Sequence, residues 1–475
     1  MKMYLNSKLD YIIMIRKKFI NRKRELKFLE EKYRAPGFEF LIITGRRRIG
    51  KSRLLIEFSK KKPAIYLMCE NRKFIYNLQK FNRIISEYFK IPIPNFKSFR
   101  ECFQYIVKAY RRRKKLVIIL DEFSYLIRRN PEIVAEFQGI VDEIIANKNI
   151  MLIICGSAVS MLQHSILEEK SPLYGRTTGN IFLGPLKIGA LREWFNTSLE
   201  EIFKIYSVAD AIPKYLEFFK GRNAEKEIVE NIFNPNQFLF REMKSIITEE
   251  FREHDTYYHI LEALSKGYTR VTEIANYTYM KSKDVASYLN ILVDVGLIQK
   301  IYPLYSKTKR GIYVIKDNYT SFWFRFISQY FEEIESGFLE SALSNFKNDF
   351  NRYLGQTFEK FVVKVSREID LQPFKPTRQG KWWYKDKEID LIALNENTGQ
   401  IAFFEIKWHS FKTLREIIII INRLQEKAKH FQWNLNSRKE YYGIVARKIA
   451  ENIKQRLKQK YLLWDIRDIE DRLKY

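Results

Sequence analysis

The chain has 475 residues, of which 46% are hydrophobic, enough for roughly three packed domains because a single core rarely grows beyond about 250–300 residues. Its 84 basic and 56 acidic residues give a formal net charge of +28, which favours a polyanionic partner, although abundant lysine is also typical of proteins built for high temperature. The three cysteines have neither a disulfide framework nor metal-site spacing, which indicates a reducing cytoplasm. Even the longest aliphatic runs, such as 417–421, are too short to cross a membrane.

Residues 1–18 are basic and lack a core pattern, so we expect an N-terminal extension, and Met14 could equally be the natural start. The segment 19–26 (FINRKREL) predicts the beginning of a helix with Asn21 as its N-cap.

Residues 41–55 read LIITGRRRIGKSRLL, an apolar β-type run, a glycine-bounded loop and an apolar helical pattern. This is the G-x-x-x-x-G-K-[ST] phosphate-binding loop in its strand–loop–helix context. Glycines let backbone N–H groups encircle phosphate oxygens, while Lys51 would contact the β- and γ-phosphates and Ser52 would ligate Mg²⁺. The predicted ATP-contacting residues of this loop are Gly45, Arg46, Arg47, Arg48, Ile49, Gly50, Lys51 and Ser52.

Strands are expected at 64–68 (AIYLM) and at the buried-type run 116–121, which ends in Asp121-Glu122. Carboxylates at the C-terminal end of such a strand lie where open α/β sheets bind ligands. Asp121 would hold Mg²⁺ through water, and Glu122 would orient and deprotonate the attacking water. The basic run 111–115 (RRRKK) before this strand is a solvated loop or a DNA contact.

Residues 150–155 (IMLIIC) and 181–186 (IFLGPL) predict two further strands of the same sheet. The first is followed by Ser157, which could cap a helix. The segment 171–176 (SPLYGR) lies between the two strands.

The segment F-I-N-R-x-x-E-L before the phosphate loop and the P-L-Y-G-R segment after it resemble the archaeal ATPase family, a branch of AAA-like proteins related to the STAND regulatory NTPases. The resemblance implies that Asn21 and Arg22 lie on the adenine side of the nucleotide and that Ser157 senses the γ-phosphate. It also implies that Arg176 is an arginine finger or sensor, which suits a ring or dimer; the alternative is a surface-loop arginine.

Residues 191–250 are expected to form a helical lid over the nucleotide. Within it, 213–216 (PKYL) resembles the family's P-x-Y-L segment, with Asp210-Ala211 in place of the usual pair of glycines.

Three short helical patterns and two alternating strands predict a winged helix-turn-helix at 251–320. The expected elements are helices near 260–264, 271–275 and 283–295, and wing strands 297–302 and 311–315. The third helix would enter the major groove of DNA with the side chains of Lys281, Ser282, Lys283, Ser287 and Tyr288. The wing would contact DNA phosphates through Lys307, Lys309 and Arg310. The alternative is a winged helix that packs domains together. The aromatic segment 317–326 favours a packed domain junction.

A helical linker, 321–345, leads to a final domain, 346–475. Its predicted helix 355–369 carries Glu359, and Asp390 lies in the strand 389–393. The strand 401–407 ends in Glu405-Ile406-Lys407, and period-two geometry puts Glu405 and Lys407 on one face. Two carboxylates and a lysine suit a Mg²⁺ ion that activates water for phosphodiester hydrolysis; a buried ion pair is the alternative.

This D…E-x-K pattern resembles the PD-(D/E)xK nuclease superfamily, and the archaeal ATPases often end in such a domain. The resemblance implies that Asp390 and Glu405 are metal ligands, that Lys407 positions the nucleophile, and that Glu359 is the helix carboxylate.

The predicted fold is therefore an α/β P-loop NTPase with a parallel sheet (19–190) and a helical lid, followed by a winged helix and an α/β restriction-endonuclease-like domain. The predicted function is Mg²⁺-dependent ATP hydrolysis coupled to DNA binding or processing. The alternative is a STAND-type regulatory switch whose catalytically silent C-terminal domain binds DNA or a protein partner.

Overall fold

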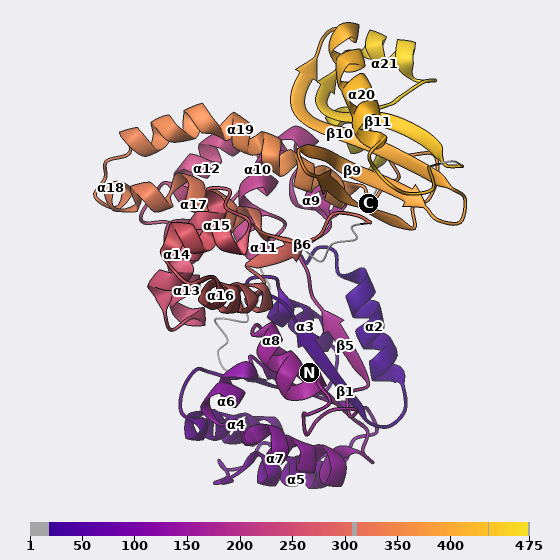
Figure 1. Ribbon diagram of the computed structural model, residues 1–475. Helices are drawn as coiled ribbons and strands as arrows, with labels where there is room; N and C mark the ends of the chain where they lie inside the picture. The colour runs from indigo at the N-terminus through magenta and orange to yellow at the C-terminus, as the bar shows by residue number, and fades with distance from the viewer. Residues whose placement is uncertain (1–18, 306–310, 436, 474–475) are drawn as a thin grey trace. The chain divides into compact units, whose positions relative to one another are not determined.

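The computed structural model describes residues 19–305, 311–435 and 437–473 (Figure 1). The chain divides into two compact units, Met1–Pro185 and Leu186–Tyr475. The predicted N-terminal extension, including Met14, and the wing residues Lys307, Lys309 and Arg310 lie outside the described residues. Among the described helices, none is long and apolar enough to cross a membrane.

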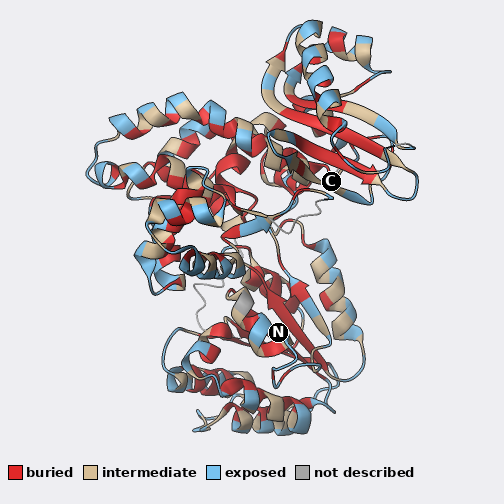
Figure 2. Ribbon diagram, viewed as in Figure 1, coloured by how far each residue is buried: buried red, intermediate tan, exposed pale blue. Residues whose placement is uncertain are grey.

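The described part of the first unit is built on a five-stranded parallel sheet in the order β2-β3-β4-β1-β5. The strands are β1 (Glu39–Thr44), β2 (Ala64–Met68), β3 (Leu116–Asp121), β4 (Ile150–Gly156) and β5 (Gly179–Phe182). Every residue of β1, β3 and β4 is buried, as expected for a parallel sheet covered on both faces (Figure 2). The prediction of a parallel P-loop sheet is thus confirmed.

Helix α2 precedes the sheet, and further helices and two π-helical turns follow its strands. They are α2 (Lys23–Arg34), α3 (Lys51–Ser59), α4 (Phe74–Phe89), α5 (Phe99–Ala109), α6 (Ser124–Arg129), α7 (Ile133–Gly139), η1 (Ile140–Ile145), α8 (Val159–Leu162) and η2 (Gln163–Leu167). The predicted N-cap of the first helix is wrong: Arg22 caps α2 in a left-handed conformation, and the Asn21 Oδ1 atom accepts a hydrogen bond from the Arg22 N–H instead.

The last strand of this sheet is also shorter than predicted. The Leu183 N–H still donates to the Thr44 carbonyl at 2.7 Å, but Pro185 has no N–H to continue the ladder. The strand therefore ends before the predicted residue 186.

The second unit begins with helices, several of which belong to a winged helix. They are α9 (Ile188–Trp194), α10 (Leu199–Ala209), α11 (Pro213–Leu216), α12 (Ala224–Ile232), α13 (Phe238–Glu250), α14 (His254–Ser265), α15 (Val271–Thr278) and α16 (Ser282–Val295). Gly296 ends α16 at a φ of 81°, and β6 (Ile298–Ile301) then pairs antiparallel with β7 (Ile312–Ile315). The three helices α14–α16 and this hairpin match the predicted winged helix-turn-helix.

The aromatic segment after the wing forms α17 (Asn318–Phe326), which is almost entirely buried. It is followed by η3 (Ser328–Tyr330), α18 (Phe331–Glu335) and the long helix α19 (Glu340–Val365). Because Phe346, Phe350 and Tyr353 of α19 pack against the Phe322 ring of α17, the helix begins well before the predicted residue 355. It ends at Val365, before the predicted residue 369.

The C-terminal part of the second unit contains, in its described residues, a mixed sheet in the order β12-β11-β10-β9-β8. Its elements are β8 (Arg378–Tyr384), β9 (Lys387–Asn395), β10 (Gln400–Phe411), α20 (Leu414–Ala428), β11 (Lys439–Ile449), α21 (Glu451–Leu457), β12 (Leu462–Asp465) and α22 (Ile466–Arg472). The edge strand β8 was not predicted, because only Trp382 of its seven residues is buried and no apolar alternation marks it.

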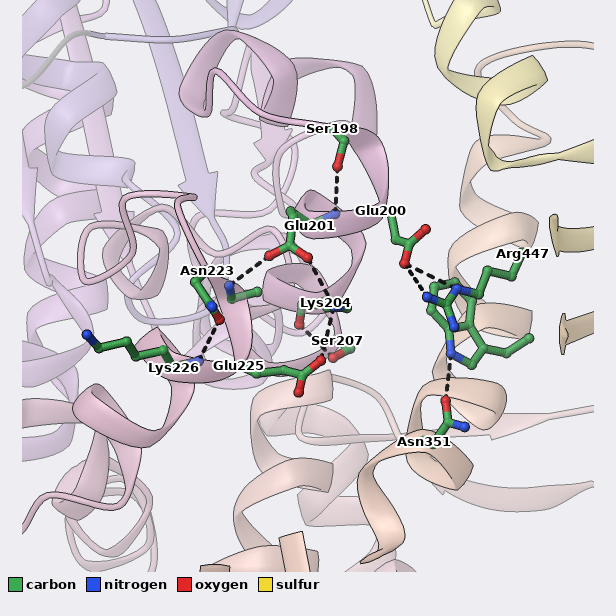
Figure 3. A network of polar contacts seen from close by, with 12 residues as sticks. Ser198, Glu200, Glu201, Lys204, Ser207, Asn223, Glu225, Lys226, Asn351 and Arg447 are labelled. Atoms are coloured by element: carbon green, nitrogen blue, oxygen red, sulfur yellow. Dashed lines mark hydrogen bonds and ion pairs between the residues drawn. The ribbon is translucent and has the colours of Figure 1, made fainter. Parts of the chain in front are cut away.

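Polar contacts tie helix α10 to this sheet within the second unit (Figure 3). The Arg447 guanidinium of β11 donates to the Glu200 carboxylate at 2.7 Å and lies over the Trp408 ring. The Trp408 indole N–H in turn donates to Asn351 of α19 at 3.0 Å. Helix α10, helix α19 and the C-terminal sheet are thereby joined.

A buried ion pair adds to this junction. Asp210, 2% exposed, accepts a 2.8 Å hydrogen bond from the Lys364 ammonium of α19 and further bonds from the N–H groups of Ala211 and Asn318. Burial acts to raise the pKa of the Asp210 carboxyl, but Lys364 and the backbone donors outweigh it and hold the pKa below its ordinary value. Asp210 is thus an anchor between α10 and α19.

Replacing Lys364 should lower the free energy of unfolding more than replacing Asp210. Lys364→Met leaves the Asp210 carboxylate buried without a counter-charge and should cost about 3–5 kcal/mol of unfolding free energy. Asp210→Asn should cost less, about 1–3 kcal/mol, since the Lys364 side chain is 38% exposed and can reach water. Thermal denaturation at pH 7 measures both.

The same pair should make stability depend on pH in a defined direction. Because the folded-state pKa of Asp210 is depressed, its contribution is present at neutral pH and is lost as the pH falls through that pKa. The difference in melting temperature between wild type and Asp210→Asn should therefore shrink in acid; an equal difference at all pH values would contradict this assignment.

Candidate nucleotide site and a second carboxylate cluster

The phosphate loop lies between β1 and α3. Gly45 follows β1, and a Cβ atom there would lie 2.4 Å from the Leu183 carbonyl oxygen, so no larger residue fits. Gly50 has a φ of 93°, which favours glycine, and it directly precedes α3. The Lys51 ammonium is buried and donates to the carbonyls of Gly45 at 2.9 Å and Arg46 at 3.2 Å, so it reaches back across its own loop.

Asp121 lies at the carboxyl end of β3 and is fully buried. Its Oδ2 atom accepts hydrogen bonds from the Ser52 hydroxyl and the Tyr66 hydroxyl, both at 2.5 Å. The thiols of Cys69 and Cys155 lie nearby, and burial followed by the Asp121 charge raises the pKa of each well above its ordinary value. The predicted magnesium-site residues Ser52 and Asp121 are therefore in direct contact.

Glu122 adopts a left-handed conformation with a φ of 52°, at the turn from β3 into α6. Its Oε2 atom accepts from the Ser157 hydroxyl at 2.8 Å and from the Ser157 N–H at 3.0 Å, while its Oε1 atom lies 3.9 Å from the Lys51 ammonium. Ser157 follows β4, which lies between β1 and β3. The three predicted residues Lys51, Glu122 and Ser157 are thus brought together.

Arg22 is also at the loop. Its guanidinium, 7% exposed, donates to the Ile49 carbonyl at 3.2 Å and to the Gly184 carbonyl at 2.7 Å. Burial lowers the pKa of Arg22 below its ordinary value, although Glu25 opposes the shift. Arg22 braces the backbone of the phosphate loop, and the predicted adenine contact of Asn21 and Arg22 stays a prediction.

The loop arginines differ in exposure. Arg48 is exposed, whereas Arg46 and Arg47 are half-buried, and Arg47 donates to the Tyr125 hydroxyl at 2.5 Å.

Arg176 pairs with a neighbouring carboxylate. Its guanidinium donates to both oxygens of Asp142 at 2.7 and 2.8 Å and holds the pKa of that carboxyl below its ordinary value. The predicted finger or sensor role of Arg176 stays a prediction.

The donor set at this edge fits a magnesium nucleotide. A buried ammonium and the loop N–H groups at the start of α3 suit phosphate oxygens, and a hydroxyl beside a carboxylate suits a hard cation. The carboxylate of Glu122 lies within the same group of contacts, on the polar edge where β1, β3 and β4 end. These residues could hold a triphosphate and a water molecule side by side.

A second cluster lies on the C-terminal sheet. The Lys407 ammonium pairs with Asp390 at 3.1 Å and with Glu405 at 2.8 Å, and both carboxylates are buried. The Lys427 ammonium of α20 pairs with the other oxygen of Glu405 at 2.5 Å. Burial opposes protonation of Lys407, but the two carboxylates outweigh it and raise its pKa. Asp390, Glu405 and Lys407 thus lie together, as the sequence predicts.

Glu359 of α19 faces the same cluster. Burial and then the charge of Asp390 raise the pKa of the Glu359 carboxyl. Among the described residues, Glu359, Glu388 and Asp390 each offer an oxygen within 4.8 Å of the others. The Lys381 ammonium pairs with Glu359 at 3.0 Å and with Glu388 at 2.5 Å. These oxygen ligands suit a divalent cation, but every one of these carboxylates is paired with a lysine or lies beside one.

Sequence reasoning missed four residues of these two sites. Tyr66 could have been found as the polar group in an otherwise aliphatic strand, AIYLM, beside the Asp-Glu strand. No comparable signal marks Glu388, Lys381 and Lys427, because charged residues are frequent along this part of the chain. The pairing of β8 with β9 brings Lys381 and Glu388 to the cluster, and the position of α20 brings Lys427 there.

Comparison with known proteins shows the class to which this fold belongs. The profile of an ATPase domain predominantly from Archaea matches residues 19–219, a winged helix-turn-helix matches 252–322, and a domain of archaeal and bacterial proteins of unknown function matches 323–418. The solved Walker-type ATPase paby2304 of Pyrococcus abyssi is similar in fold, with a TM-score of 0.50 and 24% identity over 65% of this chain and 97% of that one. The fold is that of a P-loop ATPase joined to a winged helix.

A full-length relative makes the family assignment. The uncharacterized protein MJECL04 of Methanocaldococcus jannaschii is 38% identical over 441 residues, which cover 91% of this chain and 96% of that protein. A short stretch of 44 residues is also 46% identical to the uncharacterized ATP-binding protein MJ0423 of the same organism, covering 9% of this chain and 75% of that protein. This chain belongs to the archaeal ATPase family, as its sequence motifs imply.

The Tyr66 hydroxyl should affect the affinity for magnesium nucleotide. Tyr66→Phe removes one of the two hydroxyl groups that donate to the buried Asp121 oxygen. Loss of this hydrogen bond should destabilise the observed position of the Asp121 carboxylate by about 1–3 kcal/mol. We expect about a tenfold rise in the Mg²⁺ concentration needed for half-maximal nucleotide binding.

Calorimetric titration measures this change. Tyr33→Phe is the matched control, since its hydroxyl donates to the Lys115 carbonyl beside the amino end of β3. Equal Mg²⁺ dependence of both variants would contradict a role for Tyr66.

Proposed function

We propose that this protein binds ATP with Mg²⁺ at the carboxyl edge of the first sheet and hydrolyses it. The observation that carries the proposal is the contact chain Ser52–Asp121 and Ser157–Glu122–Lys51 around one phosphate loop. A turn in the left-handed conformation directs Glu122 toward Ser157 and Lys51, which supports its assignment as the base rather than as a surface carboxylate.

The residues take separate roles in this proposal. Bound Mg²⁺ would neutralise charge on the triphosphate, with Ser52 and Asp121 as the groups that hold it. Lys51 exchanges its contacts with the Gly45 and Arg46 carbonyls for phosphate oxygens. Glu122 would orient and deprotonate the attacking water, while the Ser157 hydroxyl holds the Glu122 carboxylate and would sense the γ-phosphate.

Removing the proposed base should separate binding from turnover. Glu122→Gln keeps the shape and the contact with Ser157 but loses the proton acceptor, so we expect turnover to fall by about 10²–10⁴-fold while nucleotide affinity stays within about threefold. Phosphate release and fluorescent-nucleotide titration measure the two quantities.

Glu31→Gln is the matched control, because that side chain is 61% exposed on α2. Undiminished hydrolysis by Glu122→Gln would refute the assignment of Glu122.

We further propose that the winged helix binds DNA, so that ATP hydrolysis is coupled to it. Exposed Lys281, Ser282, Lys283 and Ser287 lie at the start of α16, the helix that enters the major groove in such modules. Tyr288 is a weaker candidate, since its hydroxyl bonds to Glu253. The net charge of +28 supports a polyanionic partner.

The second cluster supports a second candidate activity, cation-dependent hydrolysis of phosphodiesters. Asp390 and Glu405 would hold the cation, Glu359 would add a third carboxylate, and Lys407 would position the attacking water. The specific observation is that Lys407 lies within 3.1 Å of Asp390 and 2.8 Å of Glu405. A cation would have to displace Lys427 or Lys407 from Glu405.

Plasmid nicking in Mg²⁺ or Mn²⁺ tests this activity. Asp390→Asn and Lys407→Ala should each lower the nicking rate at least about 100-fold. The first removes the negative charge of a proposed cation ligand, and the second removes the ammonium group that would position the attacking water. Lys429→Ala, whose side chain is 69% exposed at the end of α20, is the matched control and should nick like the wild type.

Nicking that persists in both site variants would favour the alternative function. In that alternative, the ATPase is a STAND-type regulatory switch and the C-terminal domain only binds DNA or a protein partner.

A further inference from the structure

A basic pocket lies on the first unit at the amino ends of its strands, the sheet edge opposite the phosphate loop. It has a volume of about 480 Å³. Its lining comes from the end of α2 and from the loops that lead into β2, β3 and β4. The charged and polar lining residues are Glu30, Tyr33, Arg34, Lys61, Lys62, Lys114, Lys115 and Asn149.

Two of the five cations of this pocket hold its walls together. The buried Lys115 ammonium donates to the Ala35 carbonyl at 2.6 Å and so closes the carboxyl end of α2 onto β3. Lys62 pairs with Glu30 at 2.5 Å, donates to the Phe58 carbonyl and lies over the Phe58 ring. The ammonium groups of Lys62 and Lys115 thus already have partners within the protein and hold the wall of the pocket together.

The other three cations are exposed and point to a ligand. Arg34, Lys61 and Lys114 line the pocket, and among the described residues no carboxylate lies within ion-pair distance of any of them. The one acidic group of the lining, Glu30, already pairs with Lys62. A concave site whose lysine and arginine charges are not balanced by carboxylates suits phosphate groups.

The basic surface continues beyond the pocket. Arg111, Arg112 and Arg113 are exposed in the loop that leads to Lys114, and the loop is held in place by bonds from Asn149 to the Arg113 carbonyl and from Tyr110 to the Lys114 carbonyl. A ligand that meets both the pocket and this loop must carry several phosphates in a row. That requirement favours a nucleic-acid backbone over a single phosphate ion.

We propose that this basic pocket, defined by Arg34, Lys61 and Lys114 with the adjoining loop 111–113, binds the phosphate backbone of duplex DNA on the ATPase unit. The inference rests on the proposed coupling of ATP hydrolysis to DNA and adds a second contact to that of the winged helix. Lysines act here as point charges on phosphates, so the contact carries no base sequence preference.

The test is a salt-dependent affinity measurement on the full chain. Fluorescence anisotropy of a labelled DNA duplex is compared for wild type, Lys61→Gln/Lys114→Gln, Lys281→Gln/Lys283→Gln in α16, and a control, Lys226→Gln/Lys458→Gln, whose two lysines are exposed elsewhere. The pocket variant should bind at least about tenfold more weakly, with the slope of log affinity against log salt reduced by about 2. Its basal ATP hydrolysis should equal that of the control.

The outcomes separate this inference from the proposed function. If only the α16 variant binds weakly and the pocket variant matches the control, the pocket inference is overturned while the winged-helix assignment stands. If only the pocket variant binds weakly, the inference stands and the proposal that the winged helix binds DNA fails. If wild type binds inorganic tripolyphosphate through the pocket but binds no duplex, the ligand is a small polyphosphate and the DNA inference is overturned.

Discussion

The first unit depends on one buried charge. Asp121 is fully buried at the end of β3, and its carboxylate is stabilised there by hydroxyl donors from Ser52 and Tyr66. A buried carboxylate without such donors would cost several kilocalories per mole. The two neighbouring thiols have raised pKa values, so they stay neutral beside it. The order β3-β4-β1 is what brings the phosphate loop close enough for Ser52 to donate.

That strand order also explains the position of Glu122. Because β4 lies next to β3 in the sheet, Ser157, which follows β4, comes within hydrogen-bond distance of Glu122. Glu122 contacts Ser157 on one oxygen and approaches Lys51 with the other. The Glu122 carboxylate, which follows β3, therefore contacts groups that follow β4 and β1. A displacement of Lys51, Glu122 or Ser157 can thus alter the position of the other two side chains.

Helix α19 has a comparable place in the second unit. Within two turns it carries Glu359, which pairs with Lys381; Lys360, which donates to the Ile315 carbonyl of β7; and Lys364, which pairs with Asp210. These partners belong to the C-terminal sheet, the winged helix and the segment after α10. A shift of this helix would move the carboxylate cluster together with the winged helix, since packed elements of this kind transmit displacement.

The sequence by itself determined the phosphate loop, the Asp-Glu strand, the winged-helix pattern and the D…E-x-K spacing, because each depends on residues close together along the chain and on local periodicity. The tertiary structure decided which distant residues contact these motifs. Tyr66, Lys381 and Lys427 join the sites through strand and helix pairing over long sequence separations, and the aromatic packing of α17 extends α19 beyond its local signal. The polar residue Tyr66 stands out in its aliphatic strand, but a single sequence does not show which group its hydroxyl contacts. The two lysines have no such signal, because the local pattern of a lysine is the same whether it faces water or a buried carboxylate.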